Sequence, residues 1–301
     1  LAENPAKVIK SKLENDNLLN IRLPIDMFEE RKNSIGIDLT ETENIAKLKA
    51  GLSIFDNLKI NALSSLNKST VRNKVKSLCD GRLIGNVEFD DPEHINSNEI
   101  NALMNNEWSK TSVDHRAKTL NKVADLLQAN ANELLYLLMH ETGKTIHDAW
   151  DELREAEDFL RYYSSEGIKL QSDSIVLKGP TGELNELAYH PKGTFLCISP
   201  WNFPAAILVG QISAALITGN NVIAKPSELA SIIGYRVIEL FYKAGVPKET
   251  LLLILGGAAQ GSALSMLDDV NGVSFTGSHK TARNINKNLA QKGGPITPII
   301  A

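Results

Sequence analysis

Three apolar segments in the second half of the chain each end in a short polar motif and then lead into a helical pattern. The motifs are I-S-P-W-N-F-P at 198–204, A-K-P-S-E at 224–228 and F-T-G-S at 275–278. Alternation of apolar strands with helices is typical of a parallel sheet, in which successive strand ends face the same edge. Ligands bind outside that edge in open α/β sheets. The pattern therefore predicts a nucleotide-binding sheet with its chemistry at the strand ends.

The expected fold class is α/β, with a Rossmann-like parallel sheet preceded by a helical N-terminal region. Hydrophobic periodicity separates four predicted strands from the helices between them. We expect a further helix after Ser278 and a further apolar run at 297–301. The predicted strands are 194–198, 222–224, 251–255 and 273–275, and the predicted helices are 205–218, 228–244 and 259–267.

The first part of the chain carries mostly helical signals. Asn4-Pro5 predicts the start of a first helix, with Asn as the cap and Pro at the first helical position. Residues 41–75 read as a weakly amphipathic helical stretch, and strong helical periodicity returns at Ser112. Asp80-Gly81 separates two short apolar runs, so we expect a small hairpin there.

The third helix of the series that begins at Ser112 has an acidic face, and such faces are most simply solvated. We therefore assign its acids no chemistry. They are Asp148, Asp151, Glu152, Glu155 and Asp158. The segment 184–190 alternates apolar and polar residues and predicts an exposed strand, which Pro191 ends.

The composition argues against several classes of function. The 301 residues carry a formal net charge of −4 and no dense basic patch, so a nucleic-acid or anionic-membrane partner is disfavoured. No uninterrupted apolar run approaches the ~20 residues of a membrane helix. The histidines lack metal-ligand spacing, so we expect no metal site. Cys79 and Cys197 are the only cysteines, which suits a protein of the reducing cytoplasm.

The motif P-W-N-F-P places Asn202 between two aromatic residues, with a proline on either side that restricts the backbone. The simplest interpretation is a turn residue or a helix cap. The alternative is that its side-chain amide is held rigidly at a strand end, as a hydrogen-bond donor to a developing oxyanion. The residues alone leave both interpretations open.

In A-K-P-S-E, Lys225 ends a buried strand, where an unpaired ammonium is costly. Its partner is either a carboxylate or a ribose hydroxyl. Glu228 follows at the start of a helix, where an acid is favoured by the helix dipole. Alternatively, its carboxylate accepts hydrogen bonds from an adenosine ribose, an arrangement that favours NAD over NADP.

In F-T-G-S, a strand ends at Phe275 and a helix begins after Gly277-Ser278. Backbone N–H groups at a helix start can bind a pyrophosphate, and the plain alternative is a Ser cap. The run G-G-A-A-Q-G at 256–261 also follows a strand but is not G-x-G-x-x-G, so it is weak evidence. Cys197 lies inside a strand pattern and is interpreted as a packed thiol, and Cys79 has no visible activator.

Taken together, with E-T-G-K at 141–144 upstream, these motifs resemble the aldehyde dehydrogenase superfamily over roughly residues 80–301. Within it, C-I-S-P-W-N-F-P, V-G-Q-I-S-A-A-L and P-I-T-P-I-I-A are similar to the 1-pyrroline-5-carboxylate (L-glutamate γ-semialdehyde) dehydrogenase module of bifunctional proline utilisation proteins. K-N-S-I-G-I-D-L resembles the linker that follows their proline dehydrogenase barrel. One departure is that the family's Pro-Gly at the third strand end reads Ile254-Leu255 here, and we expect it to alter the adenine pocket.

The resemblance implies a role for each motif. Asn202 resembles the oxyanion-hole amide, and the loop before it lines the nicotinamide side of an NAD site. Lys225 and Glu228 correspond to residues that hold the adenosine ribose, and the glycines at 256–261 correspond to the adenine-side helix. The implied cofactor-binding residues are Ser199, Pro200, Trp201, Lys225, Glu228, Gly257, Gly261, Phe275, Gly277 and Ser278.

The resemblance also implies a division of the chain. Residues 1–40 correspond to the tail of the proline dehydrogenase region and the linker, and 41–301 to the NAD-binding domain. The strand near 184–190 corresponds to a segment that crosses to a neighbouring subunit, so a homo-oligomer is implied. In the family, the cysteine nucleophile, the glutamate base and the substrate-anchoring loop follow the segment that ends at Ala301. We therefore expect the catalytic domain to be absent.

The activity implied is NAD-dependent oxidation of L-glutamate γ-semialdehyde, a small-molecule aldehyde, to glutamate in proline degradation. In that reaction a thiolate attacks the aldehyde carbon, hydride passes to NAD, and water hydrolyses the thioester. We expect residues 1–301 to be inactive alone and to need a complementing chain that carries the catalytic domain. The alternative is a non-catalytic dinucleotide-binding or oligomerising remnant of a split or decaying gene.

Overall fold

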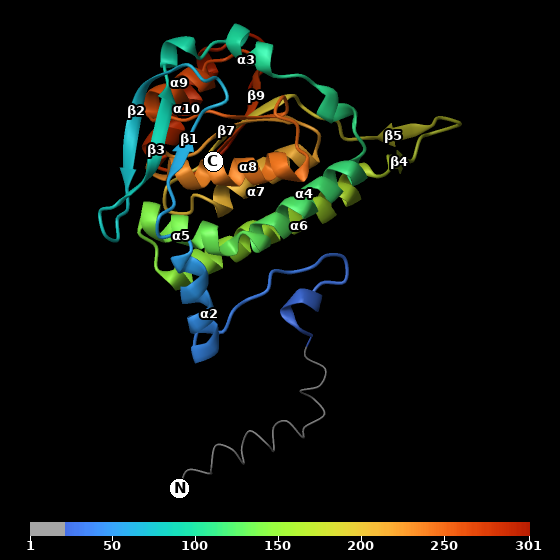
Figure 1. The fold of residues 1–301 in the computed structure, drawn as a ribbon. Helices are drawn as coiled ribbons and strands as arrows, with labels where there is room; N and C mark the ends of the chain where they lie inside the picture. The colour runs from blue at the N-terminus through green and yellow to red at the C-terminus, as the bar shows by residue number, and fades with distance from the viewer. Residues whose placement is uncertain (1–21) are drawn as a thin grey trace, which may run out of the picture.

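A five-stranded parallel sheet forms the centre of the computed structural model, which describes residues 22–301 (Figure 1). The strand order is β10-β9-β6-β7-β8, so the chain starts in the middle of the sheet and builds outward in both directions. The predicted helix at Asn4-Pro5 lies outside the described residues. The strands are β6 (Thr194–Ile198), β7 (Asn221–Lys225), β8 (Leu251–Leu253), β9 (Val270–Phe275) and β10 (Ile299–Ile300).

The predicted α/β fold class is confirmed, and the four predicted strands all form. The strand predicted at 194–198 has its expected bounds, whereas the one predicted at 251–255 stops at Leu253. The helices that follow the strands also form where they were expected. They are α7 (Ala206–Ile217), α8 (Ser231–Ala244), α9 (Ala258–Ser265) and α10 (His279–Gln291), with a short turn η5 (Glu228–Ala230) before α8.

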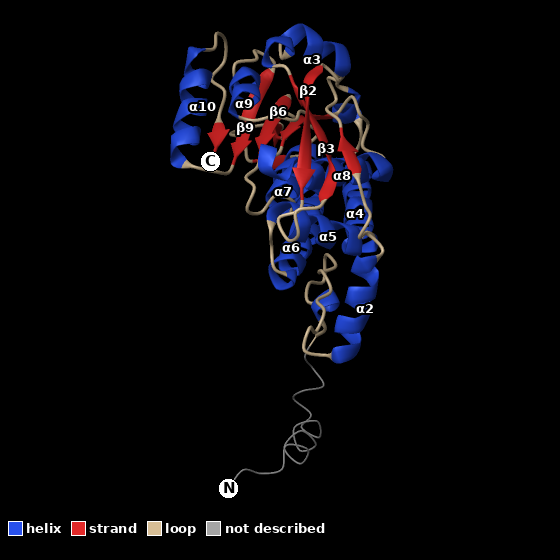
Figure 2. Cartoon of the chain, turned by 60° about the vertical axis from the view of Figure 1, so that its left-hand side comes forward, coloured by secondary structure: helices blue, strands red, loops and turns tan. Residues whose placement is uncertain are grey.

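Helices cover both faces of the sheet (Figure 2). One face packs against α7 and α8, and alternate strand residues such as Cys197 and Val222 point into that core. The other face packs against α9 and α10, and the intervening residues Leu196 and Ile223 point there. A parallel sheet that is buried on both faces explains why its strands are continuous apolar runs rather than alternating ones.

A layer of three long helices lies outside α7 and α8 (Figure 1). Asn130 is the N-cap residue of the second of these helices, and Gly143, whose φ is 72°, ends it in the left-handed region. Glycine suits this ending because it adopts that conformation without a Cβ penalty. The three helices are α4 (Val113–Ala129), α5 (Ala131–Thr142) and α6 (Ile146–Gln171).

The helical stretch predicted over 41–75 is wrong beyond residue 53. Helix α2 covers Thr42–Ser53, and the chain then forms β1 (Ile60–Ala62) and β2 (Ser69–Lys76). Strand β1 pairs in parallel with β3 (Leu83–Asp90), and β2 pairs with the other side of β3. Strand β1 gains its hydrogen bonds from a distant segment, since Ile60 pairs with Gly85, and β2 gains its hydrogen bonds from β3 across the turn between them. This pairing overrides the local helical periodicity.

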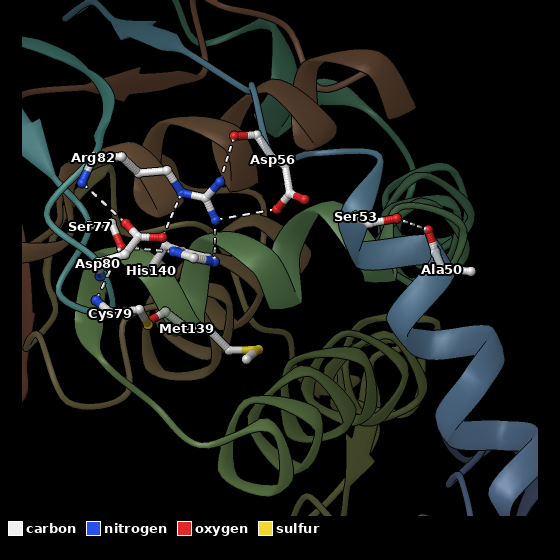
Figure 3. A network of polar contacts seen from close by, with 9 residues as sticks. All are labelled: Ala50, Ser53, Asp56, Ser77, Cys79, Asp80, Arg82, Met139 and His140. Atoms are coloured by element: carbon white, nitrogen blue, oxygen red, sulfur yellow. Dashed lines mark hydrogen bonds and ion pairs between the residues drawn. The ribbon is translucent and has the colours of Figure 1, made fainter.

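The predicted hairpin at Asp80-Gly81 is confirmed as the turn between β2 and β3. Figure 3 shows how polar contacts fasten this turn to the end of α5. Ser77 Oγ lies 2.8 Å from His140 Nδ1, and Arg82 donates to the carbonyl oxygen of Asp56 at 2.8 Å. The turn, the segment that follows α2 and the last turn of α5 are therefore tied together beside the E-T-G-K segment.

The strand predicted near 184–190 forms as β5 (Asn185–Leu187), which is shorter than expected. Its partner β4 (Ile175–Leu177) had not been predicted, and the two make an antiparallel hairpin that projects from the body (Figure 1). The remaining elements are short. They are η2 (Pro24–Asp26), η3 (Pro92–His94), α3 (Ser97–Leu103) and η4 (Glu107–Lys110).

The acidic face of α6 is not wholly solvated, which corrects the prediction. Glu152 is completely buried and accepts hydrogen bonds from the backbone N–H groups of Ala205 and Ala206. Asp158 accepts from the backbone N–H and the hydroxyl of Ser34. Both acids bind segments distant in sequence, so helical periodicity on α6 alone could not reveal their partners.

Candidate functional site

A cleft of about 1010 Å³ opens beside the carboxyl ends of β6, β7 and β9. Its volume is at the upper end of the range typical of small-molecule sites. The three polar motifs converge there because their strands are neighbours in the sheet. All eleven residues predicted for the site line this one cleft, namely Ser199, Pro200, Trp201, Asn202, Lys225, Glu228, Gly257, Gly261, Phe275, Gly277 and Ser278.

The loop between β6 and α7 carries Asn202 to the wall of the cleft. The backbone N–H of Ser199 donates to the carbonyl oxygen of Lys225 at 3.3 Å, which links this loop to the next strand end. Trp201 is 53% exposed beside the cleft. An aromatic ring and an amide therefore stand side by side at the strand edge, with both exposed to a ligand in the cleft.

Lys225 ends β7 with only 4% of its surface exposed. Burial lowers the pKa of its ammonium from 10.5 to about 8, and the nearby charge of Glu228 acts in the opposite direction. Among the described residues, Nζ makes one hydrogen bond, to the carbonyl oxygen of Pro226 at 3.3 Å. An ammonium has three donors, so this group has capacity left for a ligand oxygen.

Two glycines of α9 stand opposite Lys225 and Glu228. A Cβ on Gly261 would lie 3.4 Å from Lys225 Cε, and one on Gly257 would lie 3.7 Å from the Glu228 carboxylate. The turn before them is anchored by Gln260, which accepts from the Gly257 N–H and donates to the carbonyl oxygen of Asp90. The absence of side chains keeps this wall of the cleft open.

The pair Ile254-Leu255, which stands where the family has Pro-Gly, does not place a stiff turn at the cleft. Both side chains are fully buried in the core, and neither lines the cleft. The chain instead turns at Gly256, whose φ of 145° lies in the region that only glycine adopts readily. The flexible position is thus one residue later than the family pattern suggested.

The third motif forms the start of α10. Ser278 is its N-cap and accepts a hydrogen bond from the backbone N–H of Thr281. A Cβ on Gly277 would lie 2.7 Å from the ring of Phe275, so only glycine fits there without movement of that ring. The hydrogen bond from Thr281 shows that Ser278 caps the helix. This cap lies on the cleft wall, at the positive end of a helix dipole.

One side of the cleft was missed by the sequence reasoning. Polar residues on α10 continue the lining beyond the third motif. Their spacing of three and four positions puts them on one helical face, and this was the available signal. These residues are Asn284, Lys287, Asn288 and Gln291.

Neither cysteine lines the cleft. Cys197 is completely buried in β6, and burial raises the pKa of its thiol, so it stays protonated. Cys79 is exposed in the β2–β3 turn, where its Sγ lies 3.2 Å from the carbonyl oxygen of Met139. Within residues 22–301, no three His, Cys, Asp or Glu side chains gather to hold a metal, and no helix is long and apolar enough to cross a membrane.

The fold and the cleft define an α/β domain that presents a ligand site at the carboxyl edge of a parallel sheet. Residues 66–298 match the sequence model of the Aldehyde dehydrogenase family. This match covers well over half of the chain, so the chain belongs to the aldehyde dehydrogenase family, as the motifs had predicted.

Within the family, the chain is similar to the 1-pyrroline-5-carboxylate dehydrogenase module of proline utilisation proteins. It is 35% identical over 293 residues to Bifunctional protein PutA of Escherichia coli, which covers 93% of the chain and 21% of that protein. It is 37% identical over 185 residues to 1-pyrroline-5-carboxylate dehydrogenase of Anoxybacillus flavithermus, covering 61% of the chain and 36% of that protein. The chain thus spans about a fifth to a third of these relatives.

Solved structures agree with this placement. A point mutant of Bradyrhizobium japonicum Proline Utilization A superposes with a TM-score of 0.81 at 36% identity, covering 99% of this chain and 28% of that one. A Thermus 1-pyrroline-5-carboxylate dehydrogenase with bound NAD has a TM-score of 0.82 at 23% identity, covering 91% of this chain and 55% of that one. At this lower identity the likeness shows the fold alone.

Proposed function

We propose that this chain is the cofactor-binding part of an NAD-dependent dehydrogenase that oxidises L-glutamate γ-semialdehyde to glutamate in proline degradation. The observation that carries the proposal is the convergence of Asn202, Lys225 and Glu228 on one cleft with a glycine wall. The names of the most similar relatives support the choice of substrate. In this proposal residues 41–301 form the NAD-binding domain, and 1–40 correspond to the linker region.

The residues of the cleft fit NAD. Lys225 has free donors for ribose hydroxyls, and Glu228 offers a carboxylate as their acceptor. The positive end of α10 suits a pyrophosphate, and the glycine wall of α9 admits the adenosine half. When bound, NAD would supply the hydride acceptor. Phe275 and the loop from Ser199 to Trp201 would bound the nicotinamide end of the cleft.

Asn202 would donate its amide hydrogens to the substrate oxygen where negative charge develops, which is the role of an oxyanion-hole donor. The family's thiolate nucleophile is matched by neither Cys79 nor Cys197, because both lie away from the cleft. We therefore propose that the nucleophile and the general base come from a catalytic domain outside these 301 residues. In this proposal a separate complementing chain carries that domain.

The test is a calorimetric titration of the chain with NAD and with NADP, together with a dehydrogenase assay using glutamate semialdehyde. We expect NAD to bind more tightly than NADP, and NAD reduction to stay at the rate of a control without enzyme. Failure of both dinucleotides to bind would reject the cofactor role. Turnover by this chain alone would reject the assignment of the nucleophile to another domain.

The second candidate function is a dinucleotide-binding or oligomerising module without turnover. The exposed apolar side chains of the β4–β5 hairpin favour it, because Val176 is 67% exposed and Leu184 is 76% exposed. Such a patch marks an interaction surface. Adding a purified family catalytic domain separates the two candidates. Restored activity supports the dehydrogenase, and continued inactivity with intact NAD binding supports the module.

A further inference from the structure

The E-T-G-K segment leads from the end of α5 towards α6, and none of its residues lines the cleft. Its last residue, Lys144, reaches Glu152 two turns into α6, and its Nζ lies 2.9 Å from Glu152 Oε2. The side chain of Lys144 is 11% exposed and that of Glu152 is 0% exposed. A buried carboxylate is costly unless it is paired and hydrogen-bonded, and this one is both.

The other oxygen of Glu152 binds the start of α7. Glu152 Oε1 accepts from the backbone N–H of Ala205 at 2.7 Å and from that of Ala206 at 3.2 Å. Helix α7 has Ala205 at its N-cap, so it has no side chain of its own to cap its first N–H groups. A carboxylate from α6 takes that place, at the positive end of the α7 dipole.

Lys144 also contacts the loop between β6 and α7, which carries Asn202. Its Nζ lies 3.9 Å from the centre of the Phe203 ring, in the position of a cation–π contact. Phe203 directly follows Asn202, and Ala205 and Ala206 come two and three residues after Phe203. On the other side of Asn202, the backbone N–H of Ser199 is bound to β7. The amide of Asn202 therefore lies on a short loop that is fastened at both ends.

We propose that Lys144 and Glu152 are positioning residues that hold the P-W-N-F-P loop and so aim the amide of Asn202 into the cleft. Neither residue lines the cleft, and each acts through the backbone and the ring that flank Asn202. The anchoring of the loop stands independently of the reaction. Only its consequence for catalysis rests on the proposed function.

The loop can be observed in this chain without any ligand. Incorporation of 5-fluorotryptophan gives three fluorine NMR signals, from Trp108, Trp150 and Trp201. Trp201 neighbours Asn202, whereas Trp108 is buried, donates to the carbonyl oxygen of Leu216, and reports on the fold. The variant Trp201→Phe assigns the loop signal.

We expect Lys144→Met and Glu152→Ala to shift and broaden the Trp201 signal while the Trp108 signal stays unchanged. Lys144→Arg keeps a cation over Phe203 and should restore the wild-type signal. The matched control is Glu155→Gln, an exposed acid on the same helix, which should change nothing. If Glu152→Ala fails to fold, Lys144→Met and Lys144→Arg still decide the question.

The consequence for catalysis is tested in an active dehydrogenase that contains this chain. A misplacement of about 1 Å can cost on the order of 100-fold in rate, so Lys144→Met should lower kcat by about 10- to 100-fold. The KM for NAD should change by less than about twofold, because the proposed ribose contacts come from Lys225 at the end of β7 and Glu228 in η5.

An unmoved Trp201 signal in Lys144→Met would overturn the proposal. Equal shifts of Trp108 and Trp201 would also overturn it, since they would show a general effect on the fold. A chain that fails to bind NAD but shows the Trp201 response would reject the proposed function and leave the loop anchor established. A loop response without any loss of kcat would overturn the catalytic consequence.

Discussion

Lys225 shows how position changes the chemistry of a single residue. The end of a buried strand removes its ammonium from water, which lowers its pKa from 10.5 to about 8. The carboxylate of Glu228 opposes that shift without cancelling it. In an unfolded chain the residue would be fully charged at every physiological pH, whereas in the fold its charge is sensitive to mildly alkaline conditions.

NAD affinity should therefore depend on pH through Lys225. The charged ammonium is the stronger donor to a ribose hydroxyl, so affinity should fall by about fivefold as the pH rises from 7 to 9. Isothermal titration across this range measures the effect. Lys225→Met should bind NAD more weakly at pH 7 and show a flat profile. A wild-type profile that is also flat would contradict the assigned role.

Glu228 should set the preference between the two dinucleotides. Its carboxylate repels a 2′-phosphate, and a like-charge contact near the surface costs about 1 kcal/mol or more. Glu228→Gln should therefore improve NADP affinity by about tenfold, with a smaller loss for NAD. The exposed Glu186→Gln makes the same charge change on the β4–β5 hairpin and should leave the preference unaltered. Equal affinity changes in both variants would indicate only an effect of net charge.

At the scale of elements, acids of α5 and α6 cap two helices of the cleft. Glu152 binds the start of α7, and Glu141 binds the start of α8 through the backbone N–H groups of Ile232 and Ile233, at 2.8 and 2.7 Å. Helix α8 has Ala230 at its N-cap and so lacks a side-chain cap of its own. Both helices follow strands whose ends build the cleft, so one acid from the last turn of α5 and one from α6 fix their starts.

Stability should fall as Glu141 ionises. Burial raises its pKa from 4.5 to about 7, although the two N–H bonds favour the charged form. Between pH 4.5 and 7 the folded state holds the Glu141 proton more firmly than the unfolded state does. The contribution of Glu141 to the free energy of unfolding is therefore full below pH 4.5 and is lost as the pH rises through 7.

The shift corresponds to a loss of about 3 kcal/mol. Urea unfolding at pH 5, 6, 7 and 8 should therefore show the wild type losing stability relative to Glu141→Gln, which cannot titrate. A constant difference between the two proteins across this range would show that Glu141 does not exchange its proton on unfolding.

At the scale of the whole molecule, the β4–β5 hairpin stands away from the body, and the structure describes no covering for its apolar side chains (Figure 1). All three residues of β4 are exposed, and the hairpin contains Leu184 and Leu187 as well. An isolated two-stranded hairpin is only marginally stable in water. Burial against a neighbouring subunit would stabilise it, in agreement with the predicted role of 184–190.

Val176→Asp with Leu184→Asp should therefore weaken self-association without unfolding the chain. Sedimentation velocity should show a shift from oligomer to monomer, while the unfolding midpoint of the body stays within a few degrees. Ile54→Asp, at the end of α2, replaces an equally exposed apolar residue and serves as the control. An oligomer that survives the double change would place the interface elsewhere.

Local sequence determined the strands and the loops that follow them. The five residues Thr194–Ile198 are bounded by Gly193 and by Pro200, so apolar content and breakers alone located β6. The same signals located Asn202, Lys225 and Ser278 at strand ends. These features depend on neighbours in the chain, and the helix-ending Gly143 belongs with them.

The tertiary structure decided which contacts form between segments that are distant in the sequence. The order β10-β9-β6-β7-β8 is what brings three separate loops to one cleft, and no local pattern contains that order. Parallel pairing with a distant segment likewise makes β1 a strand. Burial against the start of α7 likewise makes Glu152 a helix cap instead of a solvated acid. Each depends on a partner that local periodicity does not specify, because the free energy comes from contacts formed only when the chain has folded.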